Sequence, residues 1–222
     1  MKPLTNLDKT YDVISIGHWW TKRQIVIFKT GKELARHKAT EHSLPPLVRT
    51  KRVREAKWVK KKIYSVSGSS NHIYHGLCCT EILVRFVASR SGCEVIGEGR
   101  LRRDKNGVVP EFGIRYPQGT ILLVEYCTTD NAKRYRLIPR KVNQYKKYLE
   151  NLEATYNAQG VVVFIIDLPI DEVKQLAARY LEGLNFIYFS SYESFLKVPL
   201  GSALYYPIYF MANGVGEGLS NV

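Results

Sequence analysis

The chain of 222 residues is long enough for one large domain or for a main domain with an appendage, and 45% hydrophobic residues exclude a disordered chain. The formal net charge of +13 favours polyanionic partners, nucleic acid first and anionic membrane surfaces second. No apolar run approaches the roughly 20 residues that span a bilayer, and residues 1–12 lack a signal-peptide core, so we expect a cytoplasmic protein with no membrane partner.

The first 70 residues are predicted to form a basic, strand-rich appendage. Alternating apolar residues and turn signals predict two strands and then a helix, over Tyr11–Gly17, Arg23–Lys29 and Thr30 to about His42. Pro45-Pro46 is expected to end that helix. The segment Ser65–Ser70 is linker-like, which predicts a domain boundary there, with the basic segment at residues 1–70 and a second domain at residues 71–222.

Basic residues are concentrated just before this linker. They are Arg49, Lys51, Arg52, Arg54, Lys57, Lys60, Lys61 and Lys62. Trp58 lies among them, so the segment is suited to contact phosphates and to stack on a base. A solvated helix face is the alternative, because isolated charge runs are usually of that kind. The net charge of the whole chain favours nucleic acid.

A helix is predicted over His72–Ser89, after the linker. Glu81 lies on or beside its apolar stripe, where an ion pair with Arg85 one turn later is the simpler interpretation. His72 and His75, three residues apart, are a weak metal signal because no cysteine or acid cluster accompanies them. Packing or hydrogen bonding of the two rings is therefore favoured.

Three strands are predicted next, with the turn Asp104–Gly107 after the first of them. They cover Cys93–Arg103, Val108–Tyr116 and Gly119–Cys127. The last two carry one acid each, Glu111 and Glu125. Side-chain alternation puts Glu125 on the same face as Leu123 and Cys127, in place of an aliphatic core residue. A buried charge needs a cation, a metal or a hydrogen bond, and two carboxylates on one hairpin suit a hard divalent ion.

The remaining elements complete a pattern of alternating helices and strands. A polar loop is expected at Thr128–Ile138, then a helix with Pro139 in its first turn and Lys141 beside its apolar stripe. The stripe consists of Val142, Tyr145, Leu149, Leu152 and Tyr156. An inner strand, a helix and a further strand follow at Gly160–Asp167, Pro169 to about Leu184 and Phe186–Phe189. This order predicts an α/β fold, and the four cysteines, all in apolar segments, suit reduced core thiols.

The elements and their acids resemble the core of PD-(D/E)XK nucleases. More narrowly, four motifs resemble replication-relaxation family proteins of plasmids and other mobile elements: His75-Gly-Leu-x-x-x-Glu81, Pro110-Glu111, Leu-Val-Glu125 and Lys141-x-x-x-Tyr145. The resemblance covers about Tyr11 to Tyr209. It implies a mixed sheet flanked by helices, preceded by a winged-helix segment. Residues Tyr11–Glu33 resemble the last strands of that segment, and the recognition helices expected before them are missing, so we expect a partial winged helix at a shortened N-terminus.

The resemblance also implies the parts of a nuclease site. Glu111, Glu125 and the backbone carbonyl of Tyr126 would hold Mg²⁺ or Mn²⁺ for hydrolysis of a DNA phosphodiester, with Glu81 assisting. The expected substrate is double-stranded DNA.

One residue departs from the nuclease motif, because Cys127 stands where the motif has its lysine. A thiol cannot replace an ammonium that stabilises the charge of the transition state. Lys141 is expected to supply this ammonium from the following helix, where the narrower family places its lysine.

Two functional classes remain open. The first is a metal-dependent DNA endonuclease that acts in replication or mobilisation of a mobile element, as a homodimer or with replication or mobilisation proteins. The second is a catalytically inactive binding module for replication or copy control, in which Arg49–Lys62 docks DNA. The positions of Glu111, Glu125 and Lys141 distinguish them, because converging carboxylates favour the enzyme and a lysine pointing to solvent favours the module.

Overall fold

The computed structural model describes residues 5–16, 19–32, 34, 36–66, 72–88, 92–102, 108–133, 137–156, 158–180, 186–200, 210–211 and 214–215. The chain divides into two compact units, Met1–Arg90 and Ser91–Val222. This division differs from the boundary expected at Ser65–Ser70, because the helix after the linker packs on elements of the first unit. None of the helices in the described ranges has the length and apolar composition needed to cross a bilayer.

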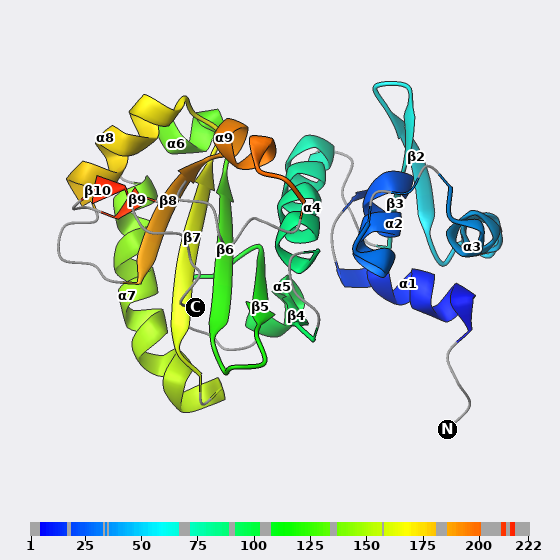
Figure 1. Cartoon of the computed structure of the whole chain (residues 1–222), viewed down its shortest axis with the longest axis horizontal. Coiled ribbons are helices and arrows are strands. Elements are labelled where there is room, and N and C mark those ends of the chain that lie inside the picture. Colours follow the sequence, from blue (N-terminus) through cyan, green and yellow to red (C-terminus); the bar gives the residue numbers. More distant parts are fainter. Residues whose placement is uncertain are drawn as a thin grey trace. The chain divides into compact units, whose positions relative to one another are not determined.

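The described residues of the first unit form four helices and a small sheet (Figure 1). In chain order its elements are α1 (Asn6–Ile16), β1 (Trp20–Thr21), α2 (Lys22–Thr30), α3 (Lys38–Arg49), β2 (Arg54–Trp58), β3 (Lys61–Ser65) and α4 (Ile73–Val87). The strands form an antiparallel sheet in the order β1-β3-β2. Helices and sheet share an apolar core whose buried residues include Ile14, Trp19, Trp20, Ile25, Leu47 and Ile63.

The two strands predicted near the start of the chain are wrong. Most of Tyr11–Gly17 lies in α1, and all of Arg23–Lys29 lies in α2. A capping box begins α2, in which the Thr21 hydroxyl accepts a hydrogen bond from the Gln24 N–H and the Gln24 side chain accepts one from the Thr21 N–H. Gly31, in the left-handed region at φ 68°, ends the helix. These two end signals outweigh the alternating apolar pattern.

The next predicted helix is also shifted along the chain. It was expected from Thr30 to His42, whereas α3 begins at Lys38 and continues past Pro45 and Pro46. Prolines remove N–H donors but leave carbonyl acceptors, and the Pro46 carbonyl accepts a hydrogen bond from the Thr50 N–H at 3.0 Å. The basic segment therefore begins at the end of a helix and continues into the hairpin of β2 and β3.

This hairpin has an unusual turn. Its last strand pair is Trp58 with Lys61, so Val59 and Lys60 alone make the turn, with φ of 44° and 64°. Two-residue turns of this kind favour asparagine and glycine, and a β-branched residue at positive φ costs roughly 1–3 kcal/mol. Figure 1 shows the hairpin projecting beyond the helices of the first unit.

The second unit is a mixed α/β structure, as expected. Its strands are β4 (Glu94–Gly97), β5 (Phe112–Arg115), β6 (Ile121–Cys127), β7 (Gly160–Ile166), β8 (Ile187–Ser191), β9 (Phe210–Met211) and β10 (Gly214–Val215). Its helices are α5 (Glu98–Leu101), α6 (Thr129–Lys133), α7 (Leu137–Tyr156), α8 (Ile170–Tyr180) and α9 (Tyr192–Lys197). The sheet order is β10-β9-β8-β7-β6-β5-β4, with β6, β7 and β8 parallel and β4, β5 and β6 antiparallel.

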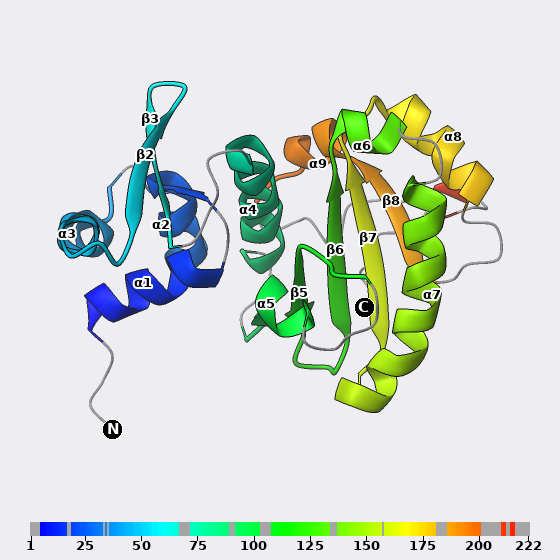
Figure 2. The same ribbon diagram turned by 180° about the vertical axis from the view of Figure 1, so that it is seen from behind.

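The centre of this sheet is the predicted inner region. All seven residues of β6 are buried, and β7 lies between β6 and β8. Leu123, Phe164 and Phe189 from these strands share a core cluster with Tyr145 of α7 and Val173 of α8. Figure 2 shows α7 running alongside the central strands. The sequence prediction of an aliphatic inner strand and of a helix packed on it is confirmed.

Two predictions for the second unit need correction. The strand expected over Cys93–Arg103 ends at Gly97, and Glu98 begins the short helix α5, where it pairs with Arg102 one turn later. The expected loop Thr128–Ile138 contains α6, whose first turn receives a weak cap from the Thr128 hydroxyl. The predicted turn at residues 104–107, the chain beyond Tyr180 up to residue 185 and the side chains of residues 152 and 156 lie outside the described residues.

Candidate functional site

The two hairpin acids are neighbours in the second unit. β5 pairs with β6 in antiparallel register as far as Phe112 opposite Val124. Glu111, the residue before Phe112, donates its N–H to the same Val124 carbonyl at 2.9 Å, and its carboxylate lies near enough to Glu125, the residue after Val124, to raise the pKa of that carboxyl. The structure thus brings together two of the predicted site residues, at the point where β6 continues beyond the start of β5.

Both carboxylate oxygens of Glu125 are bound by side chains of α7. Lys141 Nζ lies 2.5 Å from Oε2, and the Tyr145 hydroxyl donates to Oε1 at 2.7 Å. Glu125 is fully buried, and the Lys141 side chain is only 26% exposed. The amine of Lys141 therefore points into the unit and not to solvent.

The hydroxyl of Tyr145 is a part of this site that sequence reasoning missed. Tyr145 was expected as a packing residue of the apolar stripe and as part of the motif Lys141-x-x-x-Tyr145, with no role given to its hydroxyl, and it is indeed fully buried beside Phe164. Its spacing of four residues from Lys141 is the signal, because residues four apart share one face of a helix. A lysine and a tyrosine so placed over a strand with a buried acid are both within reach of that acid.

Burial sets the charge states at this site. Burial raises the pKa of Glu125. The charge of Lys141 acts to lower this pKa, and the charge of the neighbouring Glu111 acts to raise it further. Burial, the largest single effect, acts to lower the pKa of Lys141, but the attraction and hydrogen bond of Glu125 together with the other nearby groups outweigh it, so the pKa is raised. Burial raises the pKa of Tyr145 well above its ordinary value, and Glu125 adds to this rise. The phenol therefore stays protonated and donates a hydrogen bond to Glu125.

Cys127 lies two residues after Glu125 on the same face of β6 and is buried in the same core. Burial raises the pKa of its thiol to about 12, and the Glu125 carboxylate adds to that rise. The thiol is neutral at neutral pH and offers no positive charge. Lys141 supplies at this place the charge that Cys127 does not.

Tyr126, the source of the predicted backbone ligand, lies between these two residues. Its side chain points to the opposite face of β6. There it packs on Tyr192, with ring centroids 5.2 Å apart, and its hydroxyl lies 3.5 Å from the Asp167 carboxylate. The side chain thus takes no part in the Glu125 cluster.

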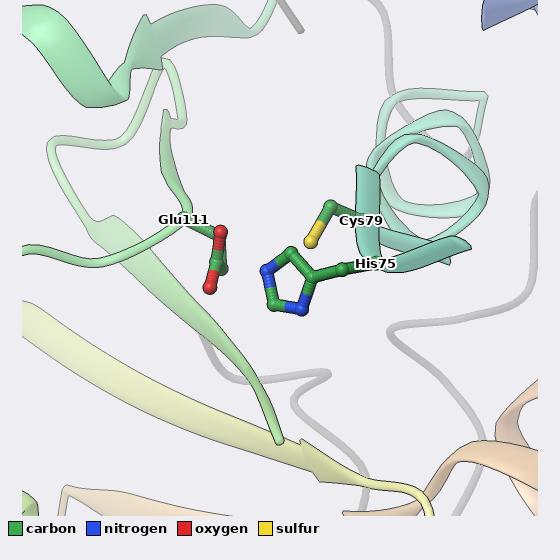
Figure 3. A group of neighbouring side chains, drawn as sticks. All are labelled: His75, Cys79 and Glu111. Carbon is green, nitrogen blue, oxygen red and sulfur yellow. The ribbon is translucent and has the colours of Figure 1, made fainter. Parts of the chain in front are cut away.

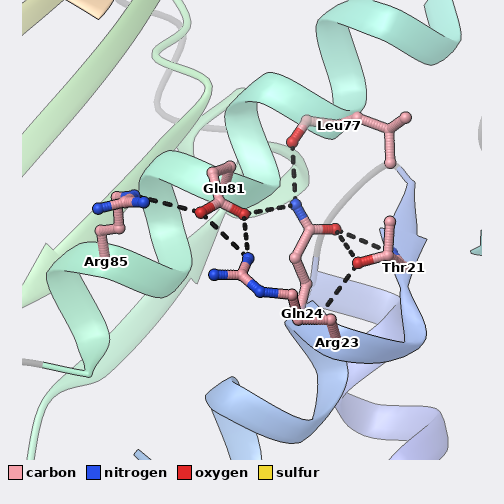
Figure 4. Close-up of polar contacts among 6 residues, drawn as sticks. All are labelled: Thr21, Arg23, Gln24, Leu77, Glu81 and Arg85. Atoms are coloured by element: carbon pink, nitrogen blue, oxygen red, sulfur yellow. Dashed lines mark hydrogen bonds and ion pairs between the residues drawn. The ribbon is translucent and has the colours of Figure 1, made fainter. Parts of the chain in front are cut away.

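Glu81 lies in a different environment, within the first unit (Figure 4). Its carboxylate pairs with Arg23 of α2 and Arg85 of α4, each at 3.2 Å, and accepts a hydrogen bond from the Gln24 amide at 3.1 Å. Gln24 also donates to the Leu77 carbonyl at 3.3 Å. The expected pair with Arg85 is confirmed, and the assisting role of Glu81 in catalysis stays a prediction.

His75 and Cys79 form a second group on α4. They lie one turn apart, and Figure 3 shows the imidazole and the thiol on the same helix. Glu111, drawn in the same picture, belongs to the second unit. An imidazole and a thiol suit Zn²⁺, but two ligands on one helix are fewer than the three or four that protein zinc sites use. The sequence prediction paired His75 with His72 and missed Cys79, four residues after His75.

The eight basic residues predicted to bind nucleic acid all lie in the first unit, at the end of α3 and in the hairpin. Among them, Arg52 and Lys62 contact other side chains of the protein. The Arg52 guanidinium lies 4.3 Å from the centre of the Tyr11 ring and 3.8 Å from Asp8, and Lys62 lies 2.9 Å from Glu55. The residues nearest the tip, Lys57, Lys60 and Lys61, are exposed.

A groove separates α3 from the hairpin. Its two carboxylates, Glu41 and Glu55, are each paired with a lysine of the same groove, Lys22 at 2.5 Å and Lys62 at 2.9 Å. The Glu55 carboxylate raises the pKa of Lys62. Because both acids are neutralised, they do not give this side of the unit an excess of negative charge.

Comparisons of the chain with protein-family models, with curated proteins and with solved structures found no match.

The first prediction concerns the buried ion pair. Lys141→Met removes the cation from a fully buried carboxylate, which should lower the free energy of unfolding by about 3 kcal/mol. Adding Glu125→Gln to this variant should recover most of the loss, because no buried charge is then left. Urea denaturation followed by far-ultraviolet circular dichroism measures both variants and the Glu125→Gln single variant. If the effects of the two single substitutions simply add, the pair carries no coupling energy.

The second prediction concerns the link between α2 and α4. Glu81→Ala removes the acceptor used by Gln24 and Arg85 in a largely buried place and should destabilise the first unit by about 2 kcal/mol. Arg23→Ala is the matched control: the Arg23 side chain is 42% exposed, so its loss should cost under about 1 kcal/mol. Denaturation followed by the fluorescence of the buried Trp19 and Trp20 reports on this unit. Equal effects of the two variants would contradict the prediction.

Proposed function

We propose that the first unit is a winged helix that binds double-stranded DNA. Its order of helix, strand, two helices and a hairpin, with a sheet arranged as β1-β3-β2, supports this proposal. The resemblance to replication-relaxation family proteins implies such a fold at this place in the chain. The segment Tyr11–Glu33, expected to form the last strands of that winged helix, contains most of α1 and all of α2 instead, and α3 follows it, so the unit has helices that could serve in recognition.

The charge of α3 and the hairpin supports DNA as the partner. An α-helix fits the major groove, which is about 12 Å wide, and lysines neutralise the phosphates beside it. The exposed face of α3 carries Lys38, His42 and Arg49, and the hairpin carries five basic residues and one acid. This distribution, together with the net charge of +13, favours contact with a polyanion.

The second unit is proposed to be a PD-(D/E)XK-like core with a metal-dependent endonuclease site. The observation that carries this proposal is the 2.5 Å contact of Lys141 Nζ with Glu125, next to Glu111. It places an ammonium, a required part of such a site, beside the two acids although the lysine of the usual motif is replaced by Cys127. The function that follows is DNA cleavage in replication or mobilisation of a plasmid or other mobile element.

The residues of this site suit a hard divalent ion. Two carboxylates and a backbone carbonyl are oxygen ligands of the kind that Mg²⁺ and Mn²⁺ prefer, and they would come from Glu111, Glu125 and Tyr126. The bound ion would activate water and offset negative charge on the phosphate. Tyr145 and Lys141 orient the Glu125 carboxylate, and the Lys141 ammonium is available to a phosphate that approaches the edge of the buried face.

A second candidate function is a nuclease-like scaffold without catalysis, which binds DNA for replication or copy control. The full burial of Glu125 favours it, since both carboxylate oxygens already have a hydrogen-bond donor. In this case Lys141 neutralises a core carboxylate and the protein acts through its first unit alone.

The third prediction tests DNA binding. Changing Lys57, Lys60 and Lys61 together to alanine should weaken binding to duplexes of any sequence. Because each lysine releases about one counterion on binding, the slope of log K against log salt should fall in magnitude by about 2 to 3. The control changes Lys146, Lys147 and Lys174, three exposed residues of the second unit, and lowers the net charge equally. Fluorescence anisotropy over a salt series measures both, and equal losses in the two triple variants would reject the hairpin as the docking surface.

The fourth prediction tests cleavage. The wild type should cleave supercoiled plasmid in Mg²⁺ or Mn²⁺, and Lys141→Ala should abolish cleavage with DNA affinity nearly unchanged, because the lost charge acts mainly in the transition state. Lys146→Ala, an exposed lysine of the same helix, is the control and should cleave normally.

A further variant separates a relocated lysine from a lost one. Cys127→Lys added to Lys141→Ala should recover part of the cleavage, because it returns an ammonium to the usual position of the motif. A wild type that is inactive while Cys127→Lys alone is active would favour the second candidate. Unchanged cleavage by Lys141→Ala would show that this lysine has no catalytic part.

A further inference from the structure

The tip of the β2–β3 hairpin combines three properties that a simple connection does not need. Val59 is 79% exposed, which makes it one of the most exposed large apolar side chains among the described residues. It has a φ of 44°, in a region that β-branched residues rarely adopt. It also stands at the outermost point of a hairpin that projects beyond the helices of its unit (Figure 1).

Neither stability nor solubility explains a valine here. A two-residue turn of this geometry is most favourable with asparagine and glycine, which accept positive φ at low cost. Because the Val59 side chain is exposed in the free protein, it adds no hydrophobic stabilisation to the fold. Strain of this kind is found at sites where the surrounding structure holds a residue for another purpose.

The surroundings of Val59 indicate what that purpose is. Lys60 follows it in the turn, Trp58 and Lys61 form the last strand pair below it, and Lys57 faces Lys62 one pair further down. Lys62 is paired with Glu55, whereas Lys57, Lys60 and Lys61 are exposed, so these three ammonium groups are available to an anionic partner. The turn thus presents one exposed apolar side chain, Val59, with the partly exposed indole of Trp58 and three exposed lysines close to it in the hairpin.

We propose that Val59 is a wedge that enters the DNA minor groove, separates one base step and bends the duplex. A duplex is a polyanion with an apolar interior of stacked bases, which matches both parts of the tip. The minor groove is about 6 Å wide and admits a narrow turn but not a whole hairpin, and apolar side chains that enter it unstack base steps and kink the helix. The lysines hold the adjacent phosphates while the valine is inserted.

This inference rests on the proposed DNA binding but adds a distortion that binding alone does not require. It also gives the site a preference, because pyrimidine–purine steps such as TA unstack most easily. A duplex with TA steps should therefore be bent more readily than one without them.

The test compares two substitutions in the full-length chain. Val59→Asn removes the apolar wedge and suits positive φ, so its melting temperature should equal or exceed that of the wild type. Val59→Ile keeps an apolar β-branched side chain. The probe is a short duplex with central TA steps, labelled at its ends for energy transfer and carrying 2-aminopurine at the central step. We expect the wild type and Val59→Ile to bend the duplex and to raise the 2-aminopurine fluorescence. We expect Val59→Asn to lose most of both signals while its affinity falls only a few-fold.

Each other outcome overturns the proposal in a recognisable way. If the wild type binds the duplex without bending or unstacking it, or if Val59→Asn distorts it equally well, Val59 is not a wedge and DNA binding still stands. If the wild type does not bind the duplex at all, the proposed DNA-binding function fails as well. If the wild type instead binds vesicles containing phosphatidylserine and loses this binding in Val59→Asn, the tip is a membrane anchor and not a DNA wedge.

Discussion

The second unit depends on the neutralisation of one carboxylate. Glu125 lies in the middle of a strand whose every residue is buried, and a carboxylate left alone there would cost several kcal/mol. Lys141 and Tyr145 meet it from α7. Besides neutralising the charge of Glu125, this contact sets the rotation of α7 about its axis and the position of α7 along β6. The same placement of α7 also packs its apolar residues on the sheet. The polar contact and the apolar stripe therefore favour the same structure.

The first unit has a comparable polar contact of its own. Gln24 caps α2 through Thr21 and, from the same amide group, reaches the Leu77 carbonyl and the Glu81 carboxylate of α4. One side chain thus satisfies a helix end and joins two helices. The two units therefore treat their acids differently. In the first, partly exposed arginines and an amide surround Glu81, whereas in the second a lysine and a phenol enclose Glu125 completely.

The sequence was a reliable guide where periodicity and burial agree. The aliphatic run of β7, the alternation that puts Glu125 on a core face and the stripe of α7 all depend on local pattern, and the structure contains them, the stripe as far as Leu149 among the described side chains. It was a poor guide where helix ends decide. The residues of α2 alternate like a strand, and the capping box at Thr21 and the left-handed Gly31 make them a helix. The contacts of Lys141 and Tyr145 with Glu125 could be expected only in outline, because they depend on how one helix settles on the sheet.

A lysine on a helix differs physically from a lysine on the strand, and this difference links the two candidate functions. A lysine at the position of Cys127 would point from the strand into the same buried face as Glu125, with little freedom to move. Lys141 reaches that face from the edge of a helix, with a quarter of its side chain exposed, so its amine can serve Glu125 and remain near solvent. If the proposed nuclease function holds, a small movement of this flexible side chain would carry its amine from Glu125 to an incoming phosphate. The buried pair and the proposed catalytic ammonium would then be two positions of the same group, and the difference in free energy between them would distinguish the two candidate functions.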